Sequence, residues 1–177
     1  VMAGQVAQLK ATKNLADKDD GKAKKEVTTL LQVMGLECEV VTDKKELEII
    51  EDMLNDLKRK GQQDNRKIFK RAFKVINKRT QAAFDTNLRN ATNKQCQLLW
   101  HGSRNANYLS ICQTGLEIRP AANGSAFGHG IYFAQHSGKS LNYSDYRGSY
   151  RSYTGGSSSQ AFLLLFNVNV GKQKVVS

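Results

Sequence analysis

Residues 95–104 read QCQLLWHGSR. Two leucines and a tryptophan lead to His101, and a glycine, a serine and an arginine follow it at once. An apolar run that ends in small polar residues predicts a buried strand that presents one imidazole at a surface opening. The sequence around His101 does not say what this imidazole contacts, so the rest of the chain has to be searched for it.

The segments around this strand predict an α+β fold. Apolar residues at steps of three and four predict an amphipathic helix over 44–60, with Leu57 on its apolar face and Gly61 at its end. Alternating residues predict a strand at 36–40 and a long, half-exposed strand over 67–84. Further along we expect a short helix ended by Gly115, a strand at 130–134, a helix within 135–143 and a fully buried strand over 161–171. This order favours a mainly antiparallel sheet with short helices.

Length and composition indicate one domain, or one domain with a helical appendage. The chain has 177 residues, and we expect a helical segment and linker over 1–35 followed by a domain over 36–177. No run approaches the roughly 20 apolar residues of a membrane span, and the N-terminus lacks the apolar region of a secretory signal. Widely spaced cysteines without a CxxC pair predict buried free thiols in a reducing, intracellular compartment and no metal site. These cysteines are Cys38, Cys96 and Cys112.

The charge balance is compatible with an anionic partner but does not require one. The chain has 27 basic and 16 acidic residues, a formal net charge of +11, which is compatible with nucleic acid, an anionic ligand or no particular partner. After His101 the only acidic residues are Glu117 and Asp145, so a cleft formed there would attract a polyanion. The lysines from Lys67 to Lys78 fit either a solvated strand face or a nucleic-acid surface.

Three clusters contain the residue types that carry chemistry: 101–103 (HGS), 127–134 (FGHGIYFA) and 139–143 (KSLNY). Each alone has an ordinary structural explanation, because a histidine at a strand end, a tyrosine in a strand and a lysine at a helix start are common. The GKS at 138–140 does not form a phosphate-binding loop, because that loop needs a glycine where the chain has Phe133.

Taken together, the clusters and the residues between them form a known pattern. The full set is LLWHGSR (98–104), Asn107, Ile111, Gly115–Leu116, FGHGIYFA and KSLNY. In order and spacing it resembles the catalytic domain of poly(ADP-ribose) polymerases, in the diphtheria-toxin-like group of ADP-ribosyltransferases, over about residues 36–171. The resemblance implies a split antiparallel sheet and NAD+ as substrate. It also implies transfer of ADP-ribose to a protein or nucleic-acid acceptor, with release of nicotinamide.

The resemblance implies that four residues bind the nicotinamide end of NAD+. Tyr132 and Tyr143 would hold the cationic ring between them, by dispersion and cation–π attraction. Gly102 would present its backbone N–H and C=O to the carboxamide, where a side chain would block the approach. Ser140 would add a hydroxyl hydrogen bond to the same amide.

At the other end of NAD+, the resemblance implies that His101 bonds a hydroxyl of the adenosine ribose, with Ser103 nearby. Lys139 would lie beside the acceptor. Catalytic roles therefore fall, by resemblance, to His101, Tyr132 and Lys139, and no metal is implied.

One part of the family pattern is missing from the chain. The family carries a glutamate on a later strand, which stabilises the sugar cation formed as nicotinamide leaves, but no glutamate follows Glu117 here. We expect a catalytic domain that lacks its C-terminal strands. Within residues 1–35 we expect either a remnant of a helical regulatory domain or an ordinary connector. Two interpretations remain open: an enzyme, or an inactive module that binds NAD+ or ADP-ribose. The resemblance also implies a nuclear location in a eukaryote or a cytoplasmic one in a bacterium, with any DNA-dependent regulation in other domains.

Overall fold

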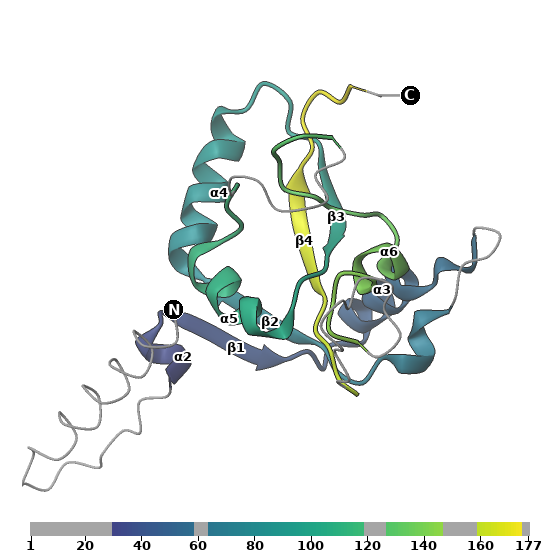
Figure 1. Cartoon of the computed structure of the whole chain (residues 1–177). Helices are drawn as coiled ribbons and strands as arrows, with labels where there is room; N and C mark the ends of the chain where they lie inside the picture. The colour runs from purple at the N-terminus through teal and green to yellow at the C-terminus, as the bar shows by residue number, and fades with distance from the viewer. Residues whose placement is uncertain (1–29, 59–63, 119–126, 147–158, 175–177) are drawn as a thin grey trace, which may run out of the picture.

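The computed structural model describes residues 30–58, 64–118, 127–146 and 159–174 (Figure 1). Short helices surround two small antiparallel sheets, β1–β2 and β3–β4, which confirms the predicted α+β fold. Most of the helical segment expected over 1–35 lies outside the described residues, so the domain boundary remains a prediction. The elements are α2 (Leu30–Val33), β1 (Leu36–Val40), α3 (Lys44–Leu54), the 3-10 helices η1 (Asp56–Lys58) and η2 (Asn65–Ile68), β2 (Phe73–Asn77), α4 (Lys78–Asn90), β3 (Cys96–His101), α5 (Asn105–Thr114), α6 (Ser137–Leu141) and β4 (Leu164–Asn169).

Strands β3 and β4 lie side by side near the centre of the view in Figure 1. They pair in antiparallel register from Cys96 opposite Asn169 to His101 opposite Leu164, so the strand that leads to His101 is confirmed. The prediction of a fully buried strand over 161–171 is wrong. β4 is shorter, and none of its residues is fully buried. The reason is that β4 pairs only with β3 in the part of the chain that the structure describes.

Trp100 anchors β3 to the neighbouring helix α3. Its side chain is 4 % exposed, and its indole Nε1 donates a hydrogen bond of 3.1 Å to the carbonyl oxygen of Met53. Its backbone N–H donates to the carbonyl oxygen of Ala134 at 2.8 Å and its own carbonyl accepts from the Ala134 N–H at 2.9 Å. Trp100 therefore holds α3 and the segment before α6 against β3.

The long strand predicted over 67–84 is wrong. Only 73–77 forms a strand, where β2 pairs with β1 and Phe73 lies opposite Val40. Helix α4 begins at the next residue because the Asn77 side chain accepts hydrogen bonds from the backbone N–H groups of Arg79, at 3.0 Å, and Thr80, at 3.3 Å. An asparagine that satisfies these first helical donors is a strong N-cap, and its effect outweighs the apolar–basic alternation.

Helix α3 confirms the predicted amphipathic helix but is shorter than expected. It begins where the Asp43 carboxylate accepts a hydrogen bond of 3.0 Å from the Glu46 N–H. It ends at Leu54, because the backbone of Asn55 leaves the helical region (φ −84°, ψ 85°). Leu57, expected on the apolar face, lies in η1 and is exposed.

The strand predicted at 130–134 is also wrong, because only Ala134 pairs, in an isolated bridge to Trp100. The preceding residues form a turn instead. Gly128 has a φ of 85°, a conformation that favours glycine. The Tyr132 hydroxyl donates a hydrogen bond of 2.7 Å back to the Gly128 carbonyl. This turn holds Tyr132 near the surface.

The two short helices predicted in the second half are confirmed as α5 and α6. α5 ends where Gly115, with a φ of 88°, donates its N–H to the carbonyl of Ile111. None of the three cysteines forms a disulfide, but the prediction that they are buried is wrong: Cys38 is exposed, and Cys96 and Cys112 are partly exposed. Of the helices in the described residues, none has both the length and the apolar character of a membrane span.

Candidate functional site

The end of β3 and helix α6 meet through direct backbone contact. A Cβ atom built on Gly102 would lie 1.8 Å from the carbonyl oxygen of Ser140 and 2.6 Å from its carbonyl carbon. No side chain fits into that space. Glycine is therefore required at position 102 by the close approach of α6.

His101 has a fixed ring orientation. Its Nδ1 lies 3.0 Å from the carbonyl oxygen of Tyr132. Because a carbonyl can only accept, the neutral imidazole carries its hydrogen on Nδ1 and has its lone pair on Nε2. The ring is packed edge-on against Phe133 and Phe166, with centroid separations of 6.0 and 6.4 Å. Nε2 can therefore accept a hydrogen bond from a hydroxyl group.

The two tyrosines of the predicted site both expose much of their surface. Tyr132 is 43 % exposed and Tyr143 is 44 % exposed. The Tyr132 hydroxyl is occupied within its own turn, since it also accepts a hydrogen bond of 3.2 Å from the Phe127 N–H. A ligand would therefore meet the ring of Tyr132 rather than its hydroxyl.

One carbonyl group, that of Ser140, connects Gly102 to Tyr143. The Ser140 carbonyl that touches Gly102 also accepts a hydrogen bond of 3.0 Å from the Tyr143 N–H. Ser140 is buried, whereas Lys139, its neighbour on α6, is exposed. The structure thus brings His101, Gly102, Tyr132, Ser140 and Tyr143 into one chain of contacts, with Lys139 at its edge.

Ser103 is held on the opposite side of the motif by α5. Its backbone N–H donates a hydrogen bond of 3.0 Å to the Tyr108 hydroxyl, and its own hydroxyl accepts one of 2.9 Å from Asn107 Nδ2. The Tyr108 hydroxyl donates in turn to the carbonyl of Phe162, just before β4. Tyr108 was not among the predicted site residues, and its position inside a helix gave no signal of this contact.

Tyr108 makes the stability of the fold sensitive to alkaline pH. Burial, with a smaller contribution from the Asp145 carboxylate, raises the pKa of Tyr108 to about 12 from its ordinary value of 10.0. The unfolded chain loses this proton first, so the stabilisation is complete below about pH 10 and is lost as the pH rises towards 12. We expect about 2 to 3 kcal/mol of unfolding free energy to disappear in that window.

Urea unfolding at several alkaline pH values measures this loss. Tyr108→Phe is the control, because it removes the titrating group and should be less stable at neutral pH but flatter between roughly pH 10 and 12. If Tyr108→Phe loses unfolding free energy just as steeply at alkaline pH, Tyr108 is not the group that causes the loss.

Asp145, one of the two acids after His101, is used structurally. Its Oδ2 accepts a hydrogen bond of 2.7 Å from the backbone N–H of Asn105, the first residue of α5. A carboxylate is favourable there because the N-terminus of a helix is partly positive. Asp145 is therefore committed to holding α5.

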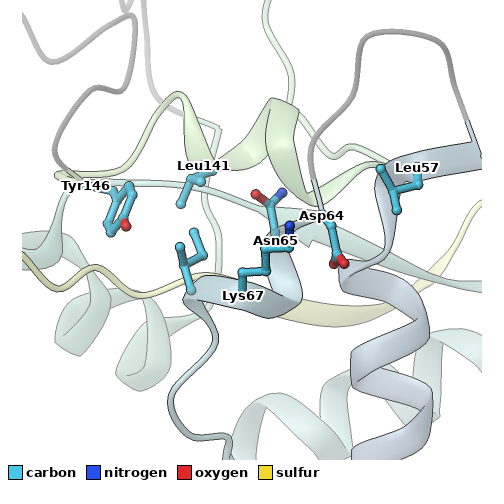
Figure 2. Close-up of a pocket in the computed structure, with 7 residues that line it drawn as sticks. Leu57, Asp64, Asn65, Lys67, Leu141 and Tyr146 are labelled. Carbon is cyan, nitrogen blue, oxygen red and sulfur yellow. The ribbon is translucent and has the colours of Figure 1, made fainter.

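A cavity of about 480 Å³ lies beside α6 but is separate from the predicted site (Figure 2). Leu141 and Tyr146 lie on one side of it and residues of η2 on the other. No predicted site residue lines it. Its lining residues are Leu57, Asp64, Asn65, Lys67, Ile68, Leu141 and Tyr146. In the described residues, no three His, Cys, Asp or Glu side chains come together as metal ligands, and the absence of a metal remains a prediction.

Comparison with known proteins identifies relatives of this chain. The model of the poly(ADP-ribose) polymerase catalytic domain matches residues 44–177. A putative poly [ADP-ribose] polymerase-like protein, 100L, of Invertebrate iridescent virus 6 is 35% identical over 96 residues, which are 52% of this chain and 47% of that protein.

Two animal relatives match a shorter part of the chain. Poly [ADP-ribose] polymerase 1 of Danio rerio is 52% identical over 50 residues, 27% of this chain and 5% of that protein. Poly [ADP-ribose] polymerase 2 of Homo sapiens is 53% identical over 49 residues, 26% of this chain and 8% of that protein. The chain thus spans about half of the viral relative and a small part of the animal ones.

Proposed function

Because the chain belongs to the family of poly(ADP-ribose) polymerase catalytic domains, we propose that it forms the NAD+-binding part of an ADP-ribosyltransferase. The reaction is transfer of ADP-ribose from NAD+ to a protein or nucleic-acid acceptor, with release of nicotinamide. The observation that carries this proposal is the contact between Gly102 and the Ser140 carbonyl. It joins the two motifs at the point where the family resemblance requires them to meet.

The nicotinamide end of NAD+ occupies the space around this contact. The carboxamide bonds to the backbone of Gly102 and to the Ser140 hydroxyl, and the ring lies between Tyr132 and Tyr143. The exposure of both tyrosines supports this assignment, because their rings are accessible to a ligand. A cationic ring between two phenols gains dispersion and cation–π attraction, and the cation–π attraction is lost when the ring leaves as neutral nicotinamide.

The adenosine ribose lies against His101. With Nδ1 directed at the Tyr132 carbonyl, Nε2 accepts the hydrogen of a ribose hydroxyl and orients the dinucleotide without moving a proton. Ser103, held by Tyr108 and Asn107, lies next to it. Lys139, exposed on α6, extends towards the acceptor.

A second candidate is a module that binds NAD+ or ADP-ribose without transferring it. It is favoured by the structural use of the Asp145 carboxylate, which bonds the backbone of α5. A carboxylate near the ribose is the group that stabilises the developing sugar cation. Transfer of labelled ADP-ribose from NAD+ separates the two candidates, since both bind the dinucleotide.

Specific nucleic-acid binding through residues 67–78 has less support. These residues do not form one continuous strand. Lys74 is paired with Glu46 at 2.9 Å, and Lys78 with Glu37 at 2.7 Å. The acidic partners interrupt the basic stripe that phosphate contacts would need.

Tyr143→Ala tests the nicotinamide site directly. We expect it to weaken binding of benzamide, a nicotinamide analogue, by about 1 to 2 kcal/mol, because one stacking partner is lost. Titration calorimetry measures this change. Tyr146→Ala is a matched control, since Tyr146 lines the separate cavity and its removal should leave the affinity unchanged. If Tyr146→Ala weakens benzamide binding and Tyr143→Ala leaves it unchanged, the ligand binds in that cavity and Tyr143 is not part of the site.

A further inference from the structure

A buried polar cluster lies on the side of α6 that faces η1 and η2. We call it the Asp56 cluster; it consists of Asp56, Asn65, His136, Ser137 and Gly138. Ser137 is 0 % exposed, Asp56 is 3 % exposed and Asn65 is 6 % exposed. The cluster joins positions that are 81 residues apart in the sequence, so its contacts depend on the tertiary fold.

The Asp56 carboxylate accepts hydrogen bonds from the start of α6 on both of its oxygens. Oδ2 accepts from the Gly138 N–H at 2.7 Å and from the Ser137 hydroxyl at 2.9 Å. Oδ1 accepts from the Ser137 N–H at 3.3 Å and lies 3.4 Å from His136 Nδ1. Asn65 Nδ2 completes the cluster by donating to the Ser137 hydroxyl at 2.9 Å.

This arrangement is needed because α6 cannot position itself. The helix has five residues, and its N-cap residue, His136, makes no side-chain capping bond. So short a helix is not stable alone. A buried carboxylate is costly unless donors surround it. Here Asn65 Nδ2 donates to Oδ2 at 3.3 Å, and the other hydrogen bonds to Asp56 come from Ser137 and Gly138 of α6. Helix α6 needs contacts with other elements to stay folded, and the Asp56 carboxylate needs the donors of α6. Both needs are met only when α6 occupies one position.

Helix α6 is therefore held at two points. Asp56 and Asn65 hold its first two residues, and the Gly102 backbone contacts Ser140 three residues after Ser137. The backbone N–H of Tyr143 donates a hydrogen bond to the Ser140 carbonyl, so the position of Tyr143 depends on that of α6. Any shift at the Asp56 end moves Ser140 and Tyr143 relative to Gly102.

We propose that Asp56 and Asn65 are positioning residues for the nicotinamide subsite, acting through Ser137 on the placement of Ser140 and Tyr143. This inference rests on the proposed function. It predicts an effect confined to one end of the dinucleotide, since His101 and Ser103 are held by other elements. A purely structural role would instead weaken all ligands together.

Two variants and two ligands test the inference by calorimetry. Asp56→Asn replaces one acceptor oxygen by a donor facing the donors of α6, and Ser137→Ala removes the hydroxyl shared by Asp56 and Asn65. Each should weaken benzamide binding on the order of tenfold, while the affinity for ADP-ribose, which lacks nicotinamide, stays within about twofold of wild type. Asp52→Asn, on the exposed face of α3, is the matched control and should change neither affinity.

The outcomes separate this inference from the proposed function. Wild-type protein that binds neither ligand would overturn the proposed function and the inference with it. Wild-type binding with unchanged benzamide affinity in a folded variant, or equal weakening of both ligands, would overturn only the positioning role. If Asp56→Asn does not fold, Ser137→Ala decides the question alone, because it retains the buried charge and removes only one small group.

Discussion

Gly102→Ala is expected to abolish measurable benzamide binding, a loss of more than about a hundredfold in affinity. The new methyl carbon would lie 1.8 Å from the Ser140 carbonyl oxygen and 3.2 Å from its Cα. These are backbone atoms, so no side-chain rotation relieves the clash and α6 has to move away from β3. The movement separates Ser140 and Tyr143 from the Gly102 backbone.

The matched control is Gly130→Ala, at a position where an added Cβ meets nothing within 4 Å. We expect it to bind benzamide like the wild type. Circular dichroism shows whether each variant folds, and calorimetry gives the affinity. A folded Gly102→Ala variant with wild-type affinity would show that close contact between these backbones is not part of the binding site.

Trp100→Ala is expected to lower the free energy of unfolding by about 3 to 5 kcal/mol, the usual cost of removing a large buried aromatic side chain. Trp100 is almost fully buried and bonds to Met53 of α3. Its loss opens a cavity between β3 and α3 and leaves the Met53 carbonyl without this donor. Urea unfolding monitored by circular dichroism measures the change.

Leu98→Ala, on the same strand, is the control for this prediction. Leu98 is 40 % exposed, so we expect a loss of about 1 kcal/mol, since little apolar surface returns to water. Equal losses for the two variants would mean that Trp100 is not the anchor between β3 and α3. Trp100→Phe retains a ring but not the indole N–H, so its loss of unfolding free energy should lie between those of Trp100→Ala and Leu98→Ala.

The parts of the fold that were predicted correctly have strong local signals. β3 follows from an uninterrupted apolar run, and the end of α5 from Gly115, whose left-handed backbone (φ 88°) stops the helix. The beginning of α3 follows from the Asp43 cap. In each case the residues that determine the element lie within it or next to it.

The errors arise where one segment fits two patterns. Residues 67–84 alternate like a strand, but the Asn77 cap begins a helix in the middle of the segment. Residues 130–134 have strand-forming side chains, but the turn at Gly128 and the hydrogen bond from Tyr132 keep all but Ala134 out of the sheet. Hydrogen bonds from single side chains override average preference in both places.

The candidate site was predictable only as a set of motifs. Their order indicated the family, and the family match confirms that assignment. The contact between Gly102 and Ser140, which are far apart in sequence, was expected only through the resemblance. The Asp56 cluster had no signal at all, because an aspartate after a helix is common and its partner lies 81 residues away.

A crystal structure of the chain with bound benzamide tests the central claim most directly. The account predicts the carboxamide within hydrogen-bond distance of the Gly102 backbone and the Ser140 hydroxyl, with the ring between Tyr132 and Tyr143. Benzamide bound instead between Leu57 and Tyr146, in the cavity of Figure 2, would contradict it.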